Sequence, residues 1–154
     1  MQGDVKVIEY LNRALKNELM SINQYFLHSR LFQSWGLQKL AAHEYEESVD
    51  EMKHADQLIQ RLLFLGGQPN MQDLDRLYIG KDVPQALQGD LTLEQAAHPL
   101  YKEAVGYAES CGDYVSRDLF AAILTSEEEH IDWLETQLAL IGQIGLANYL
   151  QTQM

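Results

Sequence analysis

The chain has 154 residues, of which 46% are hydrophobic and 22% are charged, so we expect one globular domain over residues 1–154 and exclude a disordered chain. The formal net charge is -12, which excludes nucleic acid and anionic membranes as partners and favours cations. On charge alone, an acidic surface that only maintains solubility is the simpler interpretation. Cys111 is the only cysteine, and neither a signal pattern nor a bilayer-spanning apolar run is present, so we expect a cytoplasmic protein.

The first half of the chain predicts two helices. Apolar residues recur at helical spacing over residues 4–35, and the pattern stops at Gly36. A second helical pattern covers residues 39–65 and ends in a run of turn-forming residues that begins at Gly66. The following segment, 67–82, has no clear period.

The second half predicts two more long helices. The third pattern begins near Pro84, which suits the first turn of a helix, and it stops at Gly112. The fourth covers residues 114–141, and the tail from Leu146 to Leu150 could add one or two turns. We therefore expect an all-α four-helix bundle with a short fifth helix.

The segment 67–82 is long enough to change the topology of this bundle. The short breaks at Gly36 and Gly112 favour antiparallel hairpins. Sixteen residues, in contrast, can extend over about 50 Å, and a helix of about 30 residues is about 45 Å long. We therefore expect a crossover along the bundle between the second and third helices.

Several polar residues recur at an offset of 76 residues, which indicates two hairpins of similar design. The matched pairs are Glu18 and Glu94, Tyr25 and Tyr101, Gly36 and Gly112, Glu51 and Glu127, and His54 and His130. The glutamates and histidines all fall within the apolar faces of their helices. They also lie at similar distances from the turn glycines, so we expect all six to meet near the middle of the bundle.

Four carboxylates in an apolar interior would destabilise the fold by several kcal/mol each unless cations compensated their charge. Two helices that each supply one glutamate, and two that each supply Glu-x-x-His, form the ligand set of carboxylate-bridged di-iron bundles. We therefore predict that the two metal ions are bound by the following residues: Glu18, Glu51, His54, Glu94, Glu127 and His130. A single Glu-x-x-His motif is weak evidence for a metal site. Two such motifs at one offset, both on the inward faces of their helices, are strong evidence.

Tyr25 and Tyr101 lie two helical turns after Glu18 and Glu94, respectively. We predict that each hydroxyl hydrogen-bonds to a ligand carboxylate of a neighbouring helix; the alternative is ordinary core packing. His28, His43 and His98 show no partner pattern, so we assign them to the surface or to ordinary core, and Trp35 and Trp133 to packing.

These residues resemble the bacterioferritin family, a ferritin-like family, over the whole chain. The resemblance is carried by stretches such as Ile22–His28, Asp50–Asp56, Asp113–Asp118 and Glu129–Glu135. It implies iron storage and detoxification in a hollow shell of 24 subunits, where a ferroxidase centre oxidises Fe²⁺ with O₂ or H₂O₂. It further implies that Glu51 and Glu127 bridge the two irons, and that the fifth helix lines a four-fold pore.

The resemblance also implies haem b, shared between two subunits and bound by Met52 of each. Its pocket would be lined by Leu19, Ile22, Asn23, Phe26, Tyr45 and Val49. From the residues alone, Met52 points away from the metal face and is simply a residue of a subunit contact. An iron–sulfur ferredoxin as electron donor for iron release, and co-assembly with a second subunit type, are further implications.

The chain departs from some relatives at two positions. Glu46 stands where some carry histidine, beside Asp50 in an inner-surface iron site, and Gly66 replaces an acid near a pore. Three other functions are kept as alternatives. They are a haem electron carrier with a structural metal pair, an oxygen-activating enzyme for organic substrates, which would need a substrate pocket, and a metal-free helical scaffold.

Overall fold

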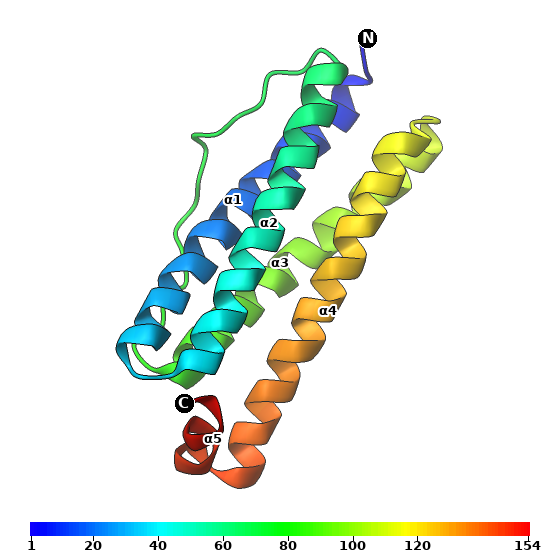
Figure 1. Ribbon diagram of the computed structural model, residues 1–154. Coiled ribbons are helices and arrows are strands. Elements are labelled where there is room, and N and C mark those ends of the chain that lie inside the picture. The colour runs from blue at the N-terminus through cyan, green and yellow to red at the C-terminus, as the bar shows by residue number, and fades with distance from the viewer.

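The computed structural model describes residues 1–154 as five helices without strands (Figure 1). Their bounds are Val5–Ser34 for α1, Gln38–Phe64 for α2, Val83–Ser110 for α3, Tyr114–Ile144 for α4 and Leu146–Gln153 for α5. The all-α prediction is confirmed, and the long helices lie within a few residues of their expected ranges. Helix α5 extends beyond Leu150, where the expected tail ended.

Aspartates fix the starts of three long helices by accepting hydrogen bonds from backbone N–H groups of the first turn. Asp4 accepts from Lys6 and Val7 before α1, and Asp113 accepts from the backbone of Ser116 before α4. Asp82 caps α3 in the same way, two residues before Pro84 in its first turn. Each cap satisfies N–H groups that have no partner inside the helix.

The two hairpin turns have the same construction. Gly36 and Gly112 adopt positive φ angles of 83° and 78°. The residue after each glycine donates its backbone N–H to the carbonyl five residues earlier, at 2.9 Å in both turns. This is the Schellman arrangement, in which glycine adopts a left-handed conformation at low cost. The predicted repeat is therefore present in the backbone as well as in the sequence.

The hairpins α1–α2 and α3–α4 pack as two units, and α1 also contacts α3. Figure 1 shows the connection between α2 and α3 running along the outside of the bundle from one end to the other. We call residues 65–82 the crossover strap; it confirms the predicted topology. No helix combines the length and hydropathy needed to cross a membrane.

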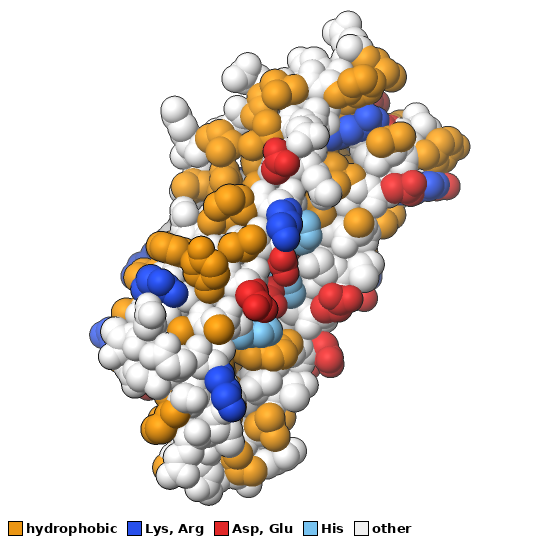
Figure 2. Space-filling view, in the orientation of Figure 1, with side chains coloured by type: hydrophobic (Ala, Val, Ile, Leu, Met, Phe, Trp, Pro, Cys, Tyr) orange, Lys and Arg blue, Asp and Glu red, His pale blue; other side chains and the backbone are white.

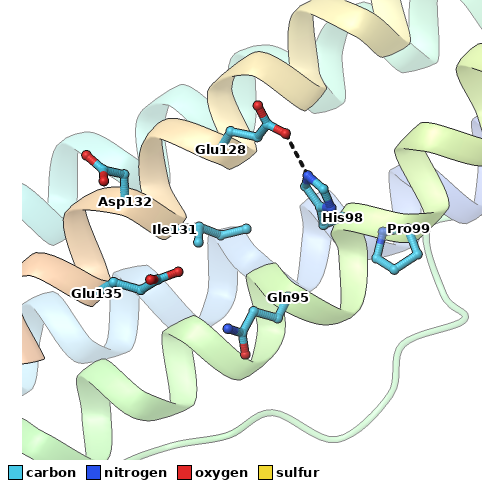
Figure 3. Close-up of a pocket in the computed structure, with 7 residues that line it drawn as sticks. All are labelled: Gln95, His98, Pro99, Glu128, Ile131, Asp132 and Glu135. Atoms are coloured by element: carbon cyan, nitrogen blue, oxygen red, sulfur yellow. Dashed lines mark hydrogen bonds and ion pairs between the residues drawn. The ribbon is translucent and has the colours of Figure 1, made fainter.

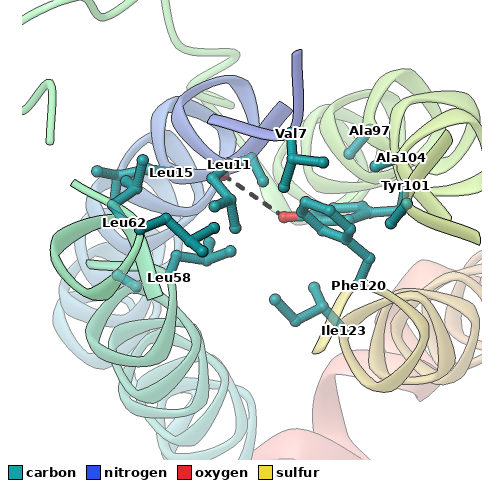
Figure 4. Close-up of a cluster of buried hydrophobic side chains, with 14 residues drawn as sticks. Val7, Leu11, Leu15, Leu58, Leu62, Ala97, Tyr101, Ala104, Phe120 and Ile123 are labelled. Atoms are coloured by element: carbon teal, nitrogen blue, oxygen red, sulfur yellow. Dashed lines mark hydrogen bonds between the residues drawn. The ribbon is translucent and has the colours of Figure 1, made fainter. Parts of the chain in front are cut away.

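Two apolar cores fill the ends of the bundle and leave a polar layer between them. The first core includes Leu11, Leu58, Tyr101 and Phe120, all fully buried (Figure 4). The second, at the other end, joins the last turn of α1 to the first turns of α2 and α3 and to Tyr149 of α5. Together these cores hold all four long helices at fixed spacing around the polar layer.

Candidate metal centre

The four predicted glutamates meet in this polar layer. Glu18, Glu51, Glu94 and Glu127 are each 0–1% exposed, and they come from α1, α2, α3 and α4, respectively. Ligating atoms of Glu51, Glu94 and Glu127 all lie within 4.8 Å of one another. The predicted convergence of the four helices on one buried level is therefore present in the structure.

The two histidines lie at opposite sides of the carboxylate cluster. His54 places Nδ1 3.6 Å from Glu18 Oε2 and 3.4 Å from Glu51 Oε2. His130 places Nδ1 3.1 Å from Glu51 Oε1 and 3.4 Å from Glu94 Oε1. Glu51 thus stands between the two imidazoles and contributes to both halves of the cluster.

The carboxylate oxygens lack the partners that burial would require. One oxygen each of Glu18 and Glu94, and both oxygens of Glu127, are buried without a hydrogen bond. An ionised carboxylate left without a partner in an interior costs several kcal/mol. Two divalent cations would carry a charge of +4 against the four carboxylates, so the donor set fits a pair of metal ions.

Two tyrosines connect the two hairpins beside this cluster. Tyr25 of α1 donates its hydroxyl hydrogen to Glu94 of α3, and Tyr101 of α3 donates to Glu18 of α1 at 2.5 Å. Both rings are buried. These reciprocal hydrogen bonds have the geometry expected of groups that orient metal ligands.

Glu47 is a further acid at the centre that the sequence interpretation missed. It pairs with Nε2 of His130, on the ring edge opposite the carboxylate cluster, and its other oxygen lies 3.1 Å from Nε2 of His43. His43 in turn stacks on Trp133, with ring centroids 3.6 Å apart. Glu47 lies one helical turn before Glu51, so the spacing alone places both side chains on one face of α2. The repeat gave no sign of Glu47, because its counterpart at the 76-residue offset is Ile123.

The electrostatics of the cluster favour bound protons when no metal ion is present. Burial lowers the pKa of His130, but hydrogen bonds to Glu47, Glu51 and Glu94 outweigh it and raise the pKa well above the usual value. Burial raises the pKa of Glu94 to about 7, against the opposing hydrogen bonds from His130 and Tyr25. Burial also opposes ionisation of Glu47, but its histidine partners lower its pKa to about 2.

Binding of Zn²⁺, a redox-inert substitute for Fe²⁺, should therefore release protons from the cluster. More protons should be released at pH 6 than at pH 8. At pH 6 both Glu94 and His130 must lose a proton to coordinate, so about two protons should leave per chain; at pH 8 only His130 should lose one, so about one should leave. A pH indicator in weakly buffered solution measures this release. Equal release at both pH values would contradict the proposed ligand roles of these residues.

Other predicted residues lie outside the cluster. Glu46 and Asp50 are exposed on α2, one turn apart. Met52, Phe26 and Tyr45 are 57%, 49% and 45% exposed, and Phe26 and Tyr45 lie side by side with ring centroids 6.3 Å apart. The remaining residues of the expected haem pocket are half-buried except for Asn23, which is exposed: Leu19, Ile22, Asn23 and Val49.

The three histidines that were assigned to the surface or to ordinary core all have polar partners. His28 is fully buried and paired with Asp90, and His43 contacts Glu47. His98 lies 2.8 Å from Glu128 at the edge of a surface cavity of about 440 Å³ between α3 and α4 (Figure 3). That cavity shares no residue with the cluster.

Acidic and histidine side chains gather along the junction of α2 and α4 (Figure 2). This row leads from the surface toward the buried glutamates, because His54 and Glu47 are partly exposed while Glu51 is fully buried. Cations therefore have a negatively charged approach to the cluster from this side.

Comparisons with known proteins agree with this geometry. Residues 8–144 match the family described as the ferritin-like domain. The chain is 50% identical to a bacterioferritin of Rhodobacter capsulatus, over 94% of this chain and 90% of the relative. It is also 50% identical to a bacterioferritin of Brucella melitensis, over 98% and 94%. A bacterial ferritin of Synechocystis is 46% identical over 100% and 99%. Together with the four-helix carboxylate cluster, these matches show that the chain belongs to the bacterioferritin family.

Proposed function

We propose that the chain stores iron by oxidising Fe²⁺ at the buried cluster, with O₂ or H₂O₂ as the oxidant. The observation that carries this proposal is the set of buried carboxylates from four helices, four of whose oxygens have no hydrogen bond, with an imidazole on either side. Each Fe²⁺ gives up one electron to the oxidant. The ferric product then collects inside the shell that the subunits form.

The six residues have distinct parts in this proposal. Glu18 and His54 bind one iron, and Glu94 and His130 bind the other. Glu51 and Glu127 reach both ions, in keeping with the position of Glu51 between the two imidazoles. Oxygen donors suit iron ions of either charge, and the anionic cage favours the more highly charged product.

Neighbouring side chains hold these ligands in place. Tyr25 and Tyr101 restrict Glu94 and Glu18 through their hydroxyl groups. Glu47 accepts from Nε2 of His130, which leaves Nδ1 to face the ion. The narrow cavity that Tyr25 and His130 line beside the centre has no room for a water molecule, which disfavours an organic substrate there.

The route of iron to and from the centre is also part of the proposal. Glu46 and Asp50 share one face of α2, and they would hold an iron ion on the inner surface of a shell of 24 subunits. An iron–sulfur ferredoxin is the proposed electron donor for release of stored iron. The lone, unpaired Cys111 agrees with the reducing conditions of the cytoplasm, where we place the protein.

The proposal is tested by measuring the size of the protein in solution together with the oxygen uptake that Fe²⁺ causes. We expect a large assembly and rapid uptake of O₂, or of H₂O₂ where peroxide is supplied. A small species that consumes neither oxidant would contradict both the storage and the oxidase parts.

Haem binding is a second proposal, and it rests on the exposed apolar side chains of Met52, Phe26 and Tyr45. Exposed apolar side chains that gather on one surface mark an interaction site, and a thioether is an established axial ligand of haem iron. Two subunits related by a two-fold axis would each supply one Met52 to a haem between them. Phe26 and Tyr45 would pack against the macrocycle.

Replacing Met52 with leucine should remove haem from the assembled protein. Leucine keeps the apolar volume but has no sulfur, so we expect at least about a tenfold loss of haem absorbance per subunit. Met71→Leu, at a comparably exposed methionine of the crossover strap, is the matched control. Haem retained by Met52→Leu would show that another residue is the ligand.

A further inference from the structure

A cavity of about 270 Å³ lies between α1, the crossover strap and α3, and it has no part in the proposed iron chemistry. Three of the eleven lysine and arginine residues of the chain line it, namely Arg13, Lys16 and Arg76. Asp75 is the only acid among its lining residues, so the lining has a formal charge of +2. The whole chain carries a charge of -12, so a basic cavity on it needs its own explanation.

The two helices give this cavity walls of opposite character. On α1, the charged and polar side chains of Arg13, Lys16 and Asn17 follow the spacing of one helical face, which ends at Met20. The wall from α3 has the same spacing but is entirely apolar, and it consists of Leu93, Ala96, Ala97 and Leu100. A molecule that fills the cavity therefore meets cations on one side and hydrocarbon on the other.

The internal repeat does not account for these cations. At the 76-residue offset, Arg13 and Lys16 correspond to Gly89 and Thr92 of α3, neither of which is charged. The second hairpin thus has the same design without cations at the equivalent positions. The fold alone does not require the two charges on α1.

Only part of the positive charge is compensated within the chain. Lys16 pairs with two aspartates of the strap, at 3.0 and 3.8 Å. Arg13 lies over the ring of Tyr10, 5.3 Å from its centroid, and neither Arg13 nor Arg76 forms an ion pair. Both guanidinium groups are therefore free for an external anion, and a guanidinium can donate two parallel hydrogen bonds to a carboxylate or phosphate.

The wall that the strap provides is held in place by both helices. Tyr78 donates its backbone N–H to the side chain of Gln24 of α1 at 2.9 Å. A Cβ atom at Gly89 of α3 would stand 2.2 Å from the carbonyl oxygen of Tyr78, so glycine allows this close approach. Asn70 donates its backbone N–H to the side chain of Asn12 at 2.9 Å. A cavity with fixed walls loses little freedom when a ligand enters.

An iron ion does not fit this cavity. Its only acid, Asp75, already pairs with Lys16, and the two arginines repel cations. The cavity also lies on the side of α1 and α3, whereas the row of acids and histidines follows the junction of α2 and α4 (Figure 2). Charge and position thus both separate it from the approach of cations to the metal centre.

We propose that the cavity binds a small organic anion, which carries a carboxylate or phosphate group on an apolar body. The anionic group pairs with Arg13 and Arg76, and the body packs between the apolar wall of α3 and Tyr78. The volume lies just below the range of about 300–1,000 Å³ that is usual for ligand pockets, which restricts the ligand to a small molecule. This proposal does not depend on the oxidase proposal.

Isothermal titration calorimetry of the assembled protein at low ionic strength tests the proposal, with benzoate and phenyl phosphate as probes. At least one probe should bind once per chain, and the comparison of the two distinguishes a carboxylate site from a phosphate site. Benzyl alcohol lacks the charge and inorganic phosphate lacks the apolar body, so both should bind at least about tenfold more weakly. Binding of neither aromatic anion, or equally tight binding of benzyl alcohol or inorganic phosphate, would overturn the proposal.

Exposed positions allow variants that leave the core intact. Arg13→Gln combined with Arg76→Gln should weaken binding of the probe at least about tenfold. Lys39→Gln combined with Lys102→Gln removes the same charge elsewhere on the surface and should change it less than about twofold. Ala96→Phe keeps every cation but fills the cavity, so it should abolish binding. Equal losses in the two charge variants, or binding retained by Ala96→Phe, would contradict a site in this cavity.

Discussion

Replacement of Glu51 with glutamine should lower the initial rate of Fe²⁺ oxidation by at least about a hundredfold. Glu51 takes part in each of the three groupings of potential ligands at the centre, with His54, with His130, and with Glu94 and Glu127. Glutamine has nearly the same shape but carries no charge, so it cannot bridge two cations or compensate their charge. Stopped-flow absorbance after mixing with Fe²⁺ and oxidant measures the rate.

Glu103→Gln is the matched control, because it removes a carboxylate from the exposed surface of α3 and should leave the rate unchanged. A Glu51→Gln protein that assembles normally and oxidises iron within about threefold of the wild-type rate would remove the bridging role. It would favour the alternative of a haem electron carrier with a structural metal pair.

Replacement of Phe120 with alanine should lower the free energy of unfolding by about 3–5 kcal/mol. Phe120 is fully buried in the core that borders the metal centre, in the same cluster as Tyr101 and Leu58. Truncation removes a whole ring from a close-packed region contributed by all four long helices, so the cavity cannot collapse fully. Chemical denaturation of the metal-free protein, followed by circular dichroism, measures the change.

Val115→Ala provides the comparison for this variant, because Val115 is on the same helix and is 62% exposed. Its effect should stay below about 0.5 kcal/mol. Similar effects of the two substitutions would indicate that the core next to the centre contributes little to stability, and that the ligands are not held by a rigid framework.

Most of the fold could be predicted because it depends on local patterns. Apolar periodicity marked the four long helices, and Gly36 and Gly112 marked turns that the structure builds in the same way. The length of residues 67–82 was enough to predict the crossover, since it follows from the reach of an extended chain. The repeat placed four glutamates and two histidines at one level, where the structure brings them together.

What the sequence interpretation missed depends on contacts between segments that the repeat does not relate. His28 meets Asp90 only because α1 packs on α3, and it meets Gly80 only because the strap crosses that face. Glu47 shares a face of α2 with Glu51, but its contact with His130 forms only because α4 packs against α2. The 76-residue offset pairs such positions with apolar residues, so the repeat does not reveal them.

The structure also weighs against two of the alternatives. A metal-free scaffold would leave four carboxylate oxygens of the centre buried without a hydrogen bond, which is costly in any interior. An enzyme for organic substrates would need an accessible cavity at the centre, whereas the cavity beside it does not admit a water molecule. The cavities that could hold a small molecule lie on the surface, as the one beside His98 does.

Anomalous diffraction at the iron absorption edge, from crystals of the assembled protein soaked in Fe²⁺, can show whether four inward carboxylates and two imidazoles bind a pair of iron ions. We predict two peaks inside each bundle, one among Glu18, Glu51 and His54 and one among Glu94, Glu127 and His130. Density that is confined to the surface, with none among these six side chains, would contradict the account.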